Sequence, residues 1–129
     1  MSDSTSLECV FCHLAPARVL DENELALAFA DAFPVSPGQT LVIPRRHVSG
    51  FFELSPAELA AVQELLFRMR SRLAAEHRPD GFNVGVNIGA AAGQTVPHVH
   101  VHLILRFFGD ATEPQGGVRN VITGKGRYA

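Results

Sequence analysis

Hydrophobic and polar residues alternate strictly in one stretch late in the chain. Histidines stand at positions 98, 100 and 102, and Val99, Val101 and Leu103 fill the positions between and after them. A period of two residues is typical of a β-strand, whose successive side chains point to opposite faces. We therefore predict a strand over residues 98–106, with the three histidines on one face and the aliphatic residues on a core face.

A second pattern, at helical spacing, follows Ser55. Ser55 can cap a helix, Pro56 suits the first helical position and Glu58 completes a capping box. The predicted helix runs over 56–77 and ends before Pro79. Its expected apolar stripe consists of Leu59, Val62, Leu66, Met69 and Leu73.

Shorter apolar segments complete the expected elements. Residues 17–20 and 25–31 read as a hairpin turned at 21–23, residues 40–43 as a buried strand that stops at Pro44, and residues 82–87 as a further strand. Residues 1–6 are expected to be a flexible tail and residues 109–129, rich in Gly and Pro, an irregular one. No repeat or second domain is evident.

Composition narrows the class of protein. The chain has 129 residues, 47% of them hydrophobic, and a net charge of −2, which fits one globular domain. We expect no nucleic-acid partner, since no basic field exists, and no membrane span. The polar, acidic N-terminus is unlike a secretory signal, so we expect a cytoplasmic protein. In that compartment a close cysteine pair suits a metal or redox site better than a structural disulfide.

Three histidines in strict alternation indicate a functional site rather than an ordinary polar strand face. A neutral imidazole can attack a phosphorus or carbonyl centre and form a covalent intermediate. Alternatively, three histidines could hold a catalytic zinc with one open position. The preceding loop favours a phosphate ligand, because glycines let the backbone approach an anion and amide or hydroxyl groups can donate to it. Its candidate residues are Asn87, Gly93, Gln94 and Thr95.

Two isolated signals are more open. Cys9 and Cys12 form a C-x-x-C pair, which could be half a zinc site, a redox pair or two small hydrophobic residues. A tetrahedral zinc would need two histidines to complete it. Asp31, at the end of a predicted strand, could bind ribose hydroxyls or cap a loop.

In four segments the chain resembles the histidine triad (HIT) family of nucleotide hydrolases and transferases. These segments are 9–12, 28–31, 37–44 and, the most specific, 93–102 with its Gly-Gln-Thr-Val-Pro-His-Val-His-Val-His run. The resemblance implies one α+β domain over 1–129. The HIT-like fold has a five-stranded antiparallel sheet, one long helix and a short N-terminal helix. It also implies a homodimer.

The resemblance assigns a role to each matching position. It implies cleavage at the α-phosphate of a nucleoside phosphate, with adenosine favoured, in a phosphoanhydride or phosphoramidate. His100 is implied as the nucleophile, His102 as a phosphate donor and Thr95 as a hydroxyl near the leaving group. Asn87, Gly93 and Gln94 would complete the phosphate cradle, Asp31 would bind ribose, and Val10, Phe11, Leu14 and Phe29 would wall a base pocket or simply pack in the core.

The resemblance also implies a structural zinc, bound by Cys9, Cys12, His47 and His98, which leaves His100 free of metal. Mg²⁺ could accompany a polyphosphate substrate. Two rival functions stay open, namely a three-histidine zinc hydrolase and a nucleotide-binding regulatory protein with little turnover.

The chain departs from the family pattern at two positions. Gln39 stands where many members carry a histidine that supports the triad, and glutamine cannot carry a proton. Leu105 replaces a common proline, which should alter only the local strand end.

Overall fold

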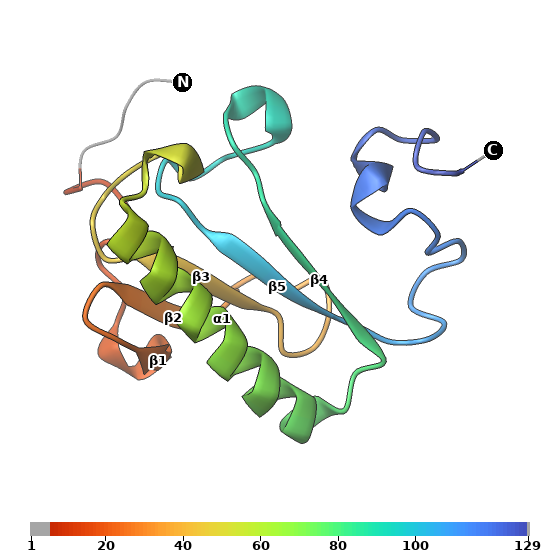
Figure 1. Ribbon diagram of the computed structural model, residues 1–129, viewed down its shortest axis with the longest axis horizontal. Helices are drawn as coiled ribbons and strands as arrows, with labels where there is room; N and C mark the ends of the chain where they lie inside the picture. Colours follow the sequence, from red (N-terminus) through yellow and green to blue (C-terminus); the bar gives the residue numbers. More distant parts are fainter. Residues whose placement is uncertain (1–5, 129) are drawn as a thin grey trace.

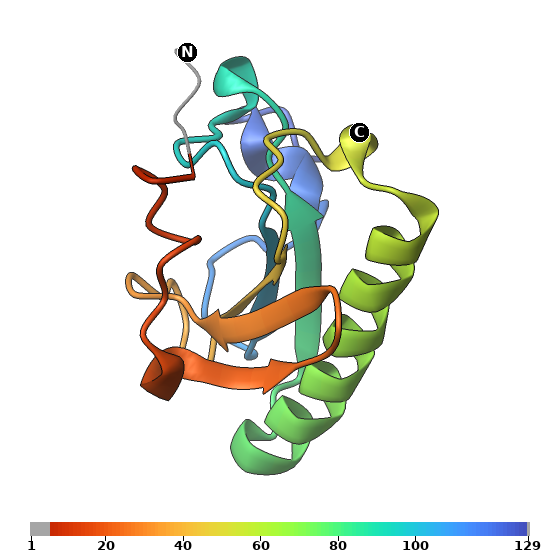
Figure 2. The ribbon, with the colours of Figure 1, turned by 90° about the vertical axis from the view of Figure 1, so that its left-hand side faces the viewer.

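A single antiparallel sheet with one long helix on one face organises the protein. The computed structural model describes residues 6–128. Helix α1 (Pro56–His77) crosses one face of the sheet, and the N-terminal segment lies on the opposite face (Figures 1 and 2). This is the α+β architecture that the family resemblance predicted. The short N-terminal helix is the three-residue 3-10 helix η1 (Pro16–Arg18).

The five strands are hydrogen-bonded in the order β1-β2-β3-β5-β4. They are β1 (Val19–Glu22), β2 (Ala26–Ala30), β3 (Thr40–Pro44), β4 (Gly81–Val86) and β5 (Val101–Arg106). Every residue of β3 is buried, as its β-branched sequence predicted. β5 lies between β3 and β4, so its residues have neighbours on both sides.

The capping box at the start of α1 is confirmed, but the predicted apolar stripe is partly wrong. The Ser55 hydroxyl accepts a hydrogen bond from the Glu58 backbone N–H at 3.1 Å, and the Glu58 carboxylate accepts one from the Ser55 N–H at 2.9 Å. Leu59 is 42% exposed, whereas Leu65, left out of the prediction, is fully buried. The observed face is rotated because the sheet meets α1 along Glu58, Val62, Leu65, Met69 and Leu73.

The first hairpin turns later than predicted. The Asn23 side chain accepts hydrogen bonds from the backbone N–H groups of Leu25 and Ala26, at 3.1 and 2.8 Å. This side-chain turn moves the bend to residues 23–25, so β1 occupies 19–22 rather than 17–20.

The histidine strand begins three residues later than predicted. Before Val101 the chain leaves the sheet, and the Val99 N–H donates to the Val48 carbonyl at 2.8 Å instead of to a strand. Only His102 therefore lies within β5, while His98 and His100 lie in the segment that leads into it. The His100 and His102 rings still lie side by side, with centroids 5.1 Å apart.

After β5 the described residues form no further strand, and their one helix is the 3-10 helix η4 (Gly117–Val121). This segment follows β5 and lies beside the edge strand β4 (Figure 1). Within residues 6–128, no helix has the length and apolar character needed to cross a membrane.

Candidate functional site

Two cysteines and two histidines from distant segments meet beside the triad. One ligand atom from each of Cys9, Cys12, His47 and His98 lies within 4.8 Å of all the others. The Cys9 Sγ is 3.4 Å and the Cys12 Sγ is 3.5 Å from the His98 Nδ1, and the Cys12 Sγ is 3.4 Å from the His47 Nδ1. The four residues brought together are those that the family resemblance implied.

The geometry of this group fits a tetrahedral zinc ion. With Zn–S near 2.3 Å and Zn–N near 2.0 Å, a tetrahedron separates sulfur from nitrogen by about 3.5 Å. The His98 Nε2 lies 2.8 Å from the Pro44 carbonyl, which can only accept, so this nitrogen donates and the Nδ1 is left as the ligand. Burial lowers the pKa of His98, which keeps the ring neutral as a ligand must be.

The two thiols also favour a cation. Burial, followed by the adjacent Cys9, raises the pKa of the Cys12 thiol to about 11. A divalent ion would supply the positive charge that two neighbouring thiolates need. Among residues 6–128 this is the one group of three or more His, Cys, Asp or Glu side chains that is arranged to hold a metal.

An ion pair next to His47 ties the loop after β3 to the helix. The Arg46 guanidinium donates two hydrogen bonds of 2.9 Å to the buried Glu58 carboxylate. This pairing, with the bond from Ser55, lowers the pKa of Glu58 to about 2. The capping residue of α1 thus also positions the segment that carries His47.

The His100 ring is oriented by the backbone of His98. Its Nδ1 lies 2.8 Å from the His98 carbonyl oxygen, so the Nδ1 carries the proton and the lone pair is on Nε2. The Phe11 ring contacts the His100 ring edge to face, with centroids 5.1 Å apart. The cluster therefore holds His98 through its side chain, while His98 orients His100 through its backbone.

A cavity of ≈ 410 Å³ opens over His100. Among its lining residues are Val10, Phe11, Phe29, Asp31, Thr95 and His100, so most of the predicted nucleoside and leaving-group residues are gathered here. Leu14 is an exception, because it packs on the far side of Phe11 against the apolar cluster around Phe29. Arg18 also lines the cavity and lies 5.5 Å from the centre of the Phe29 ring.

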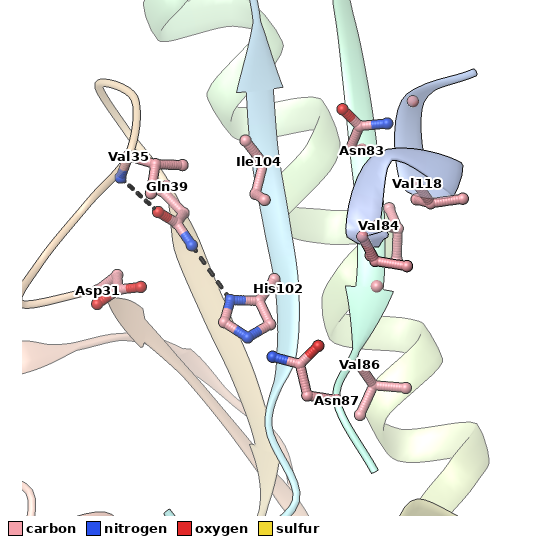
Figure 3. Close-up of a pocket in the computed structure, with 13 residues that line it drawn as sticks. Asp31, Val35, Gln39, Asn83, Val84, Val86, Asn87, His102, Ile104 and Val118 are labelled. Atoms are coloured by element: carbon pink, nitrogen blue, oxygen red, sulfur yellow. Dashed lines mark hydrogen bonds between the residues drawn. The ribbon is translucent and has the colours of Figure 1, made fainter. Parts of the chain in front are cut away.

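Gln39 determines which nitrogen of His102 carries the proton. Its Oε1 accepts from the Val35 backbone N–H at 2.8 Å, so its Nε2 must donate to the His102 Nδ1, 3.2 Å away (Figure 3). In the neutral ring the proton is then on Nε2, a buried atom without a hydrogen-bond partner among the described residues. Burial, followed by the neighbouring His100, lowers the pKa of His102 and favours this neutral donor.

The loop before the triad divides into a supporting part and a part that faces the cavities. The buried Gln94 side chain accepts from the Gly89 N–H and donates to the carbonyls of Ser49 and Val96, at 2.9 to 3.0 Å. Its amide thus holds the loop together, and Gly93, with a φ of 90°, permits the turn beside it. The phosphate contacts predicted for Gly93, Gln94 and Asn87 stay predictions; Asn87 lies beside His102 (Figure 3).

Sequence reasoning missed two contributors to this site. Arg18 was not singled out because an isolated arginine before a strand carries no recognisable spacing. Gln39 was noted only as a departure from the family pattern. Its contact with His102 joins residues 63 positions apart in the chain, and its bond from Val35 depends on the turn between them. The ladder between Leu41 and His102 brings these segments together.

Comparison with known proteins agrees with this arrangement. The model of the HIT domain matches residues 13–109. The chain belongs to the HIT family. One relative in Schizosaccharomyces pombe is an adenosine 5′-monophosphoramidase, which is 36% identical over 76% of this chain and 74% of its own length. Another is an asymmetrical bis(5′-nucleosyl)-tetraphosphatase, which is 33% identical over 88% of this chain and 68% of its own length.

A solved structure of the family bears on the metal cluster. The zinc-bound histidine triad protein of Mycobacterium smegmatis is 36% identical, with a TM-score of 0.73 over 84% of this chain and 82% of that one. In the present chain, Cys9, Cys12, His47 and His98 form a candidate metal site.

Proposed function

We propose that this HIT protein cleaves the α-phosphate linkage of a nucleoside phosphate through a covalent nucleotidyl-histidine on His100. The observation that carries this proposal is the hydrogen bond from the His100 Nδ1 to the His98 carbonyl, which directs the Nε2 lone pair away from the backbone. The names of the two yeast relatives, a phosphoramidase and a tetraphosphatase, support a nucleotide substrate.

The reaction has two displacements. The His100 Nε2 lone pair forms a bond to the α-phosphorus, the bond to the leaving nitrogen or oxygen breaks, and the leaving atom takes up a proton from water. A second water then attacks phosphorus, the P–N bond to His100 breaks, and the water's proton returns to solvent. The products are a nucleoside monophosphate, the leaving group and neutral His100.

Neighbouring groups would bind the reacting phosphate. The His102 Nε2–H would donate to a phosphate oxygen, and this buried donor would gain a partner it otherwise lacks. Thr95 would lie near the leaving group, with Asn87, Gly93 and Gln94 around the phosphate. Asp31 would accept from the ribose hydroxyls, and Val10, Phe11 and Phe29 would contact the base, which we propose is adenine.

The cluster would serve as a structural zinc site. A bound zinc would supply a crosslink between the N-terminal segment, the loop after β3 and the triad, and it would leave the His100 ring to react. We also propose a cytoplasmic homodimer, and Mg²⁺ as a companion of any polyphosphate substrate, on the strength of the family resemblance.

The two rivals predict different results. A three-histidine zinc hydrolase needs all three rings on one ion, but the His98 ring faces the cysteines while the His102 Nδ1 faces Gln39. A regulatory nucleotide-binding protein would bind nucleotide without turnover.

The test combines adenosine 5′-phosphoramidate hydrolysis with metal analysis in the wild type and His100→Asn. We expect His100→Asn to lose at least about a thousandfold in kcat/KM while its zinc content is unchanged. Wild-type enzyme quenched in alkali, where a phosphorus–nitrogen bond to histidine is stable, should carry an adenylyl adduct on His100. His77→Asn, at the exposed end of α1, is the matched control and should retain activity.

Two results would overturn the proposal. Loss of zinc together with activity in His100→Asn would support the three-histidine site. No turnover of amidates or dinucleoside polyphosphates by the zinc-loaded wild type would support the regulatory protein.

A further inference from the structure

A second cavity lies on the other side of His102 from the nucleoside cavity. It has a volume of ≈ 440 Å³ and is bounded by β4, β5 and η4. Asp31 and His102 line both cavities, so the second cavity adjoins the first beside the triad. Figure 3 shows His102 and Asn87 next to each other, with Ile104 and Val118 farther along the lining.

The absence of a side chain at Gly85 helps to make this space. Gly85 is directly opposite His102 in the β4–β5 ladder, so a side chain at this position would point to the same face as the His102 ring. A Cβ built at Gly85 meets no atom within 4 Å. The cavity is therefore open beside the one ring that both cavities share.

The charge of the lining distinguishes between classes of ligand. Aliphatic residues, including Ile104, Val118 and Val121, form much of the wall, together with the neutral amides of Asn83 and Asn87. No arginine or lysine among the described residues lines it, and its one acidic residue is Asp31. The nearby Arg106 donates to both oxygens of Asp110 and to Asn83. A polyphosphate chain would find no cationic side chain in this cavity. An uncharged apolar group would instead contact aliphatic side chains and neutral amides.

We propose that this cavity binds the leaving group of the substrate, and that the preferred leaving group is an uncharged, apolar amine or alcohol rather than a nucleoside polyphosphate. This inference rests on the proposed function, because it takes the α-phosphate to lie against His100 and His102. Thr95 and His102 line the first cavity, so a nucleoside bound there would direct the departing group past these two residues into the second cavity. The aliphatic wall contributes binding, and Asn87 is placed to contact the departing atom.

The test compares three substrates that share adenosine and the α-phosphate. They are the unsubstituted phosphoramidate, the N-phenethyl phosphoramidate and diadenosine tetraphosphate. In the zinc-loaded wild type we expect kcat/KM for the phenethyl amidate to exceed that for the unsubstituted one by roughly tenfold, as burial of an aromatic ring predicts. Diadenosine tetraphosphate should be the poorest of the three.

Two variants change the cavity in opposite ways. Gly85→Val should fill the space and reduce the ratio of phenethyl to unsubstituted kcat/KM by roughly tenfold. Val118→Lys should supply the missing cation and shift preference toward diadenosine tetraphosphate. Gly81→Val is the matched control, because Gly81 is in the same strand, its Cβ also meets open space and it does not line this cavity. It should leave the ratio unchanged.

The possible failures are distinguishable. If no substrate forms an adduct on His100, the proposed function fails. If adducts form but the wild type treats both amidates alike, prefers diadenosine tetraphosphate, or shows the same change in Gly81→Val as in Gly85→Val, only the leaving-group assignment is wrong. If Gly85→Val changes the sedimentation mass but not the ratio, the cavity belongs to an interface with a second copy of this chain, and the assignment is again wrong.

Discussion

The histidines on the two sides of His100 differ in how many of their ring nitrogens have partners within the protein. On the N-terminal side, four metal-ligand side chains converge within 4.8 Å and His98 is fully buried. On the C-terminal side, His102 lines an open cavity with aliphatic walls, and its buried Nε2 has no hydrogen-bond partner among the described residues. The closed side can position His100, and the open side is free to bind a substrate. Under the proposed mechanism, one neighbour of His100 would keep the ring in place and the other would select the substrate.

Breaking the closed side should have the largest effect. We expect Cys12→Ala to lose the bound zinc, and with it the stabilisation that a ligand at a thousand times its Kd contributes, about 4 kcal/mol. Metal content by mass spectrometry and the free energy of unfolding measure this. His13→Asn is a suitable control, since His13 is exposed and outside the cluster. Full zinc content in Cys12→Ala would contradict the assigned ligand set.

The Arg46–Glu58 pair supports the same side at a smaller cost. Because the pKa of Glu58 is lowered to about 2, the pair stabilises the fold above the ordinary carboxyl pKa, and that contribution is lost as pH falls toward 2. We expect Glu58→Gln to lower the free energy of unfolding by roughly 1–3 kcal/mol at pH 7. Near pH 2 the variant and the wild type should be about equally stable, because the wild-type pair has then lost its contribution. Urea unfolding across this pH range measures it. The exposed pair of Glu64 with Arg68 is the control, and Glu64→Gln should cost below about 0.5 kcal/mol.

The boundary between the two sides is the hydrogen bond from Gln39 to His102. In Gln39→Glu a carboxylate would accept from the His102 Nδ1–H, raise the pKa of the ring and leave the Nε2 without a proton once the ring is neutral. Activity should then fall as pH rises through the raised pKa, by roughly tenfold at pH 8, whereas the wild type keeps its Nε2 donor there. The pH profile of kcat/KM tests this.

Gln39→Met separates this effect from a loss of packing. It removes the donor without adding a charge, so it should lower activity at all pH values without moving the profile. If the Gln39→Glu and Gln39→Met profiles coincide, Gln39 has only a structural role.

Trimming the open side should affect stability least. Val118 is 59% exposed on η4, so Val118→Ala should change the free energy of unfolding by less than about 0.5 kcal/mol. The matched substitution Val62→Ala, on the buried face of α1, should cost well over 1 kcal/mol. Equal costs would mean that η4 is part of the core and that the two sides of the triad do not differ as described.

Several features were predictable because they depend on residues close together in sequence. The capping box at Ser55 and Glu58, the buried strand predicted over 40–43 and the alternation of three histidines each follow from local geometry. The start of β5 was not predictable in this way, since the Val99 N–H pairs with Val48, which is far from it in the chain. The buried face of α1 was misjudged for a similar reason, because the sheet decides whether Leu59 or Leu65 is covered.

The sequence by itself determined the family, the elements and the chemical repertoire of this protein, namely two thiols, a row of imidazoles and a glycine-rich loop. The tertiary structure decided what each imidazole does. His98 is paired with Cys9 from the opposite end of the chain, His100 donates to the His98 carbonyl, and His102 accepts from Gln39. A proton's position on a histidine ring depends on its partner, and these partners are brought together by sheet pairing and loop packing that no local pattern encodes.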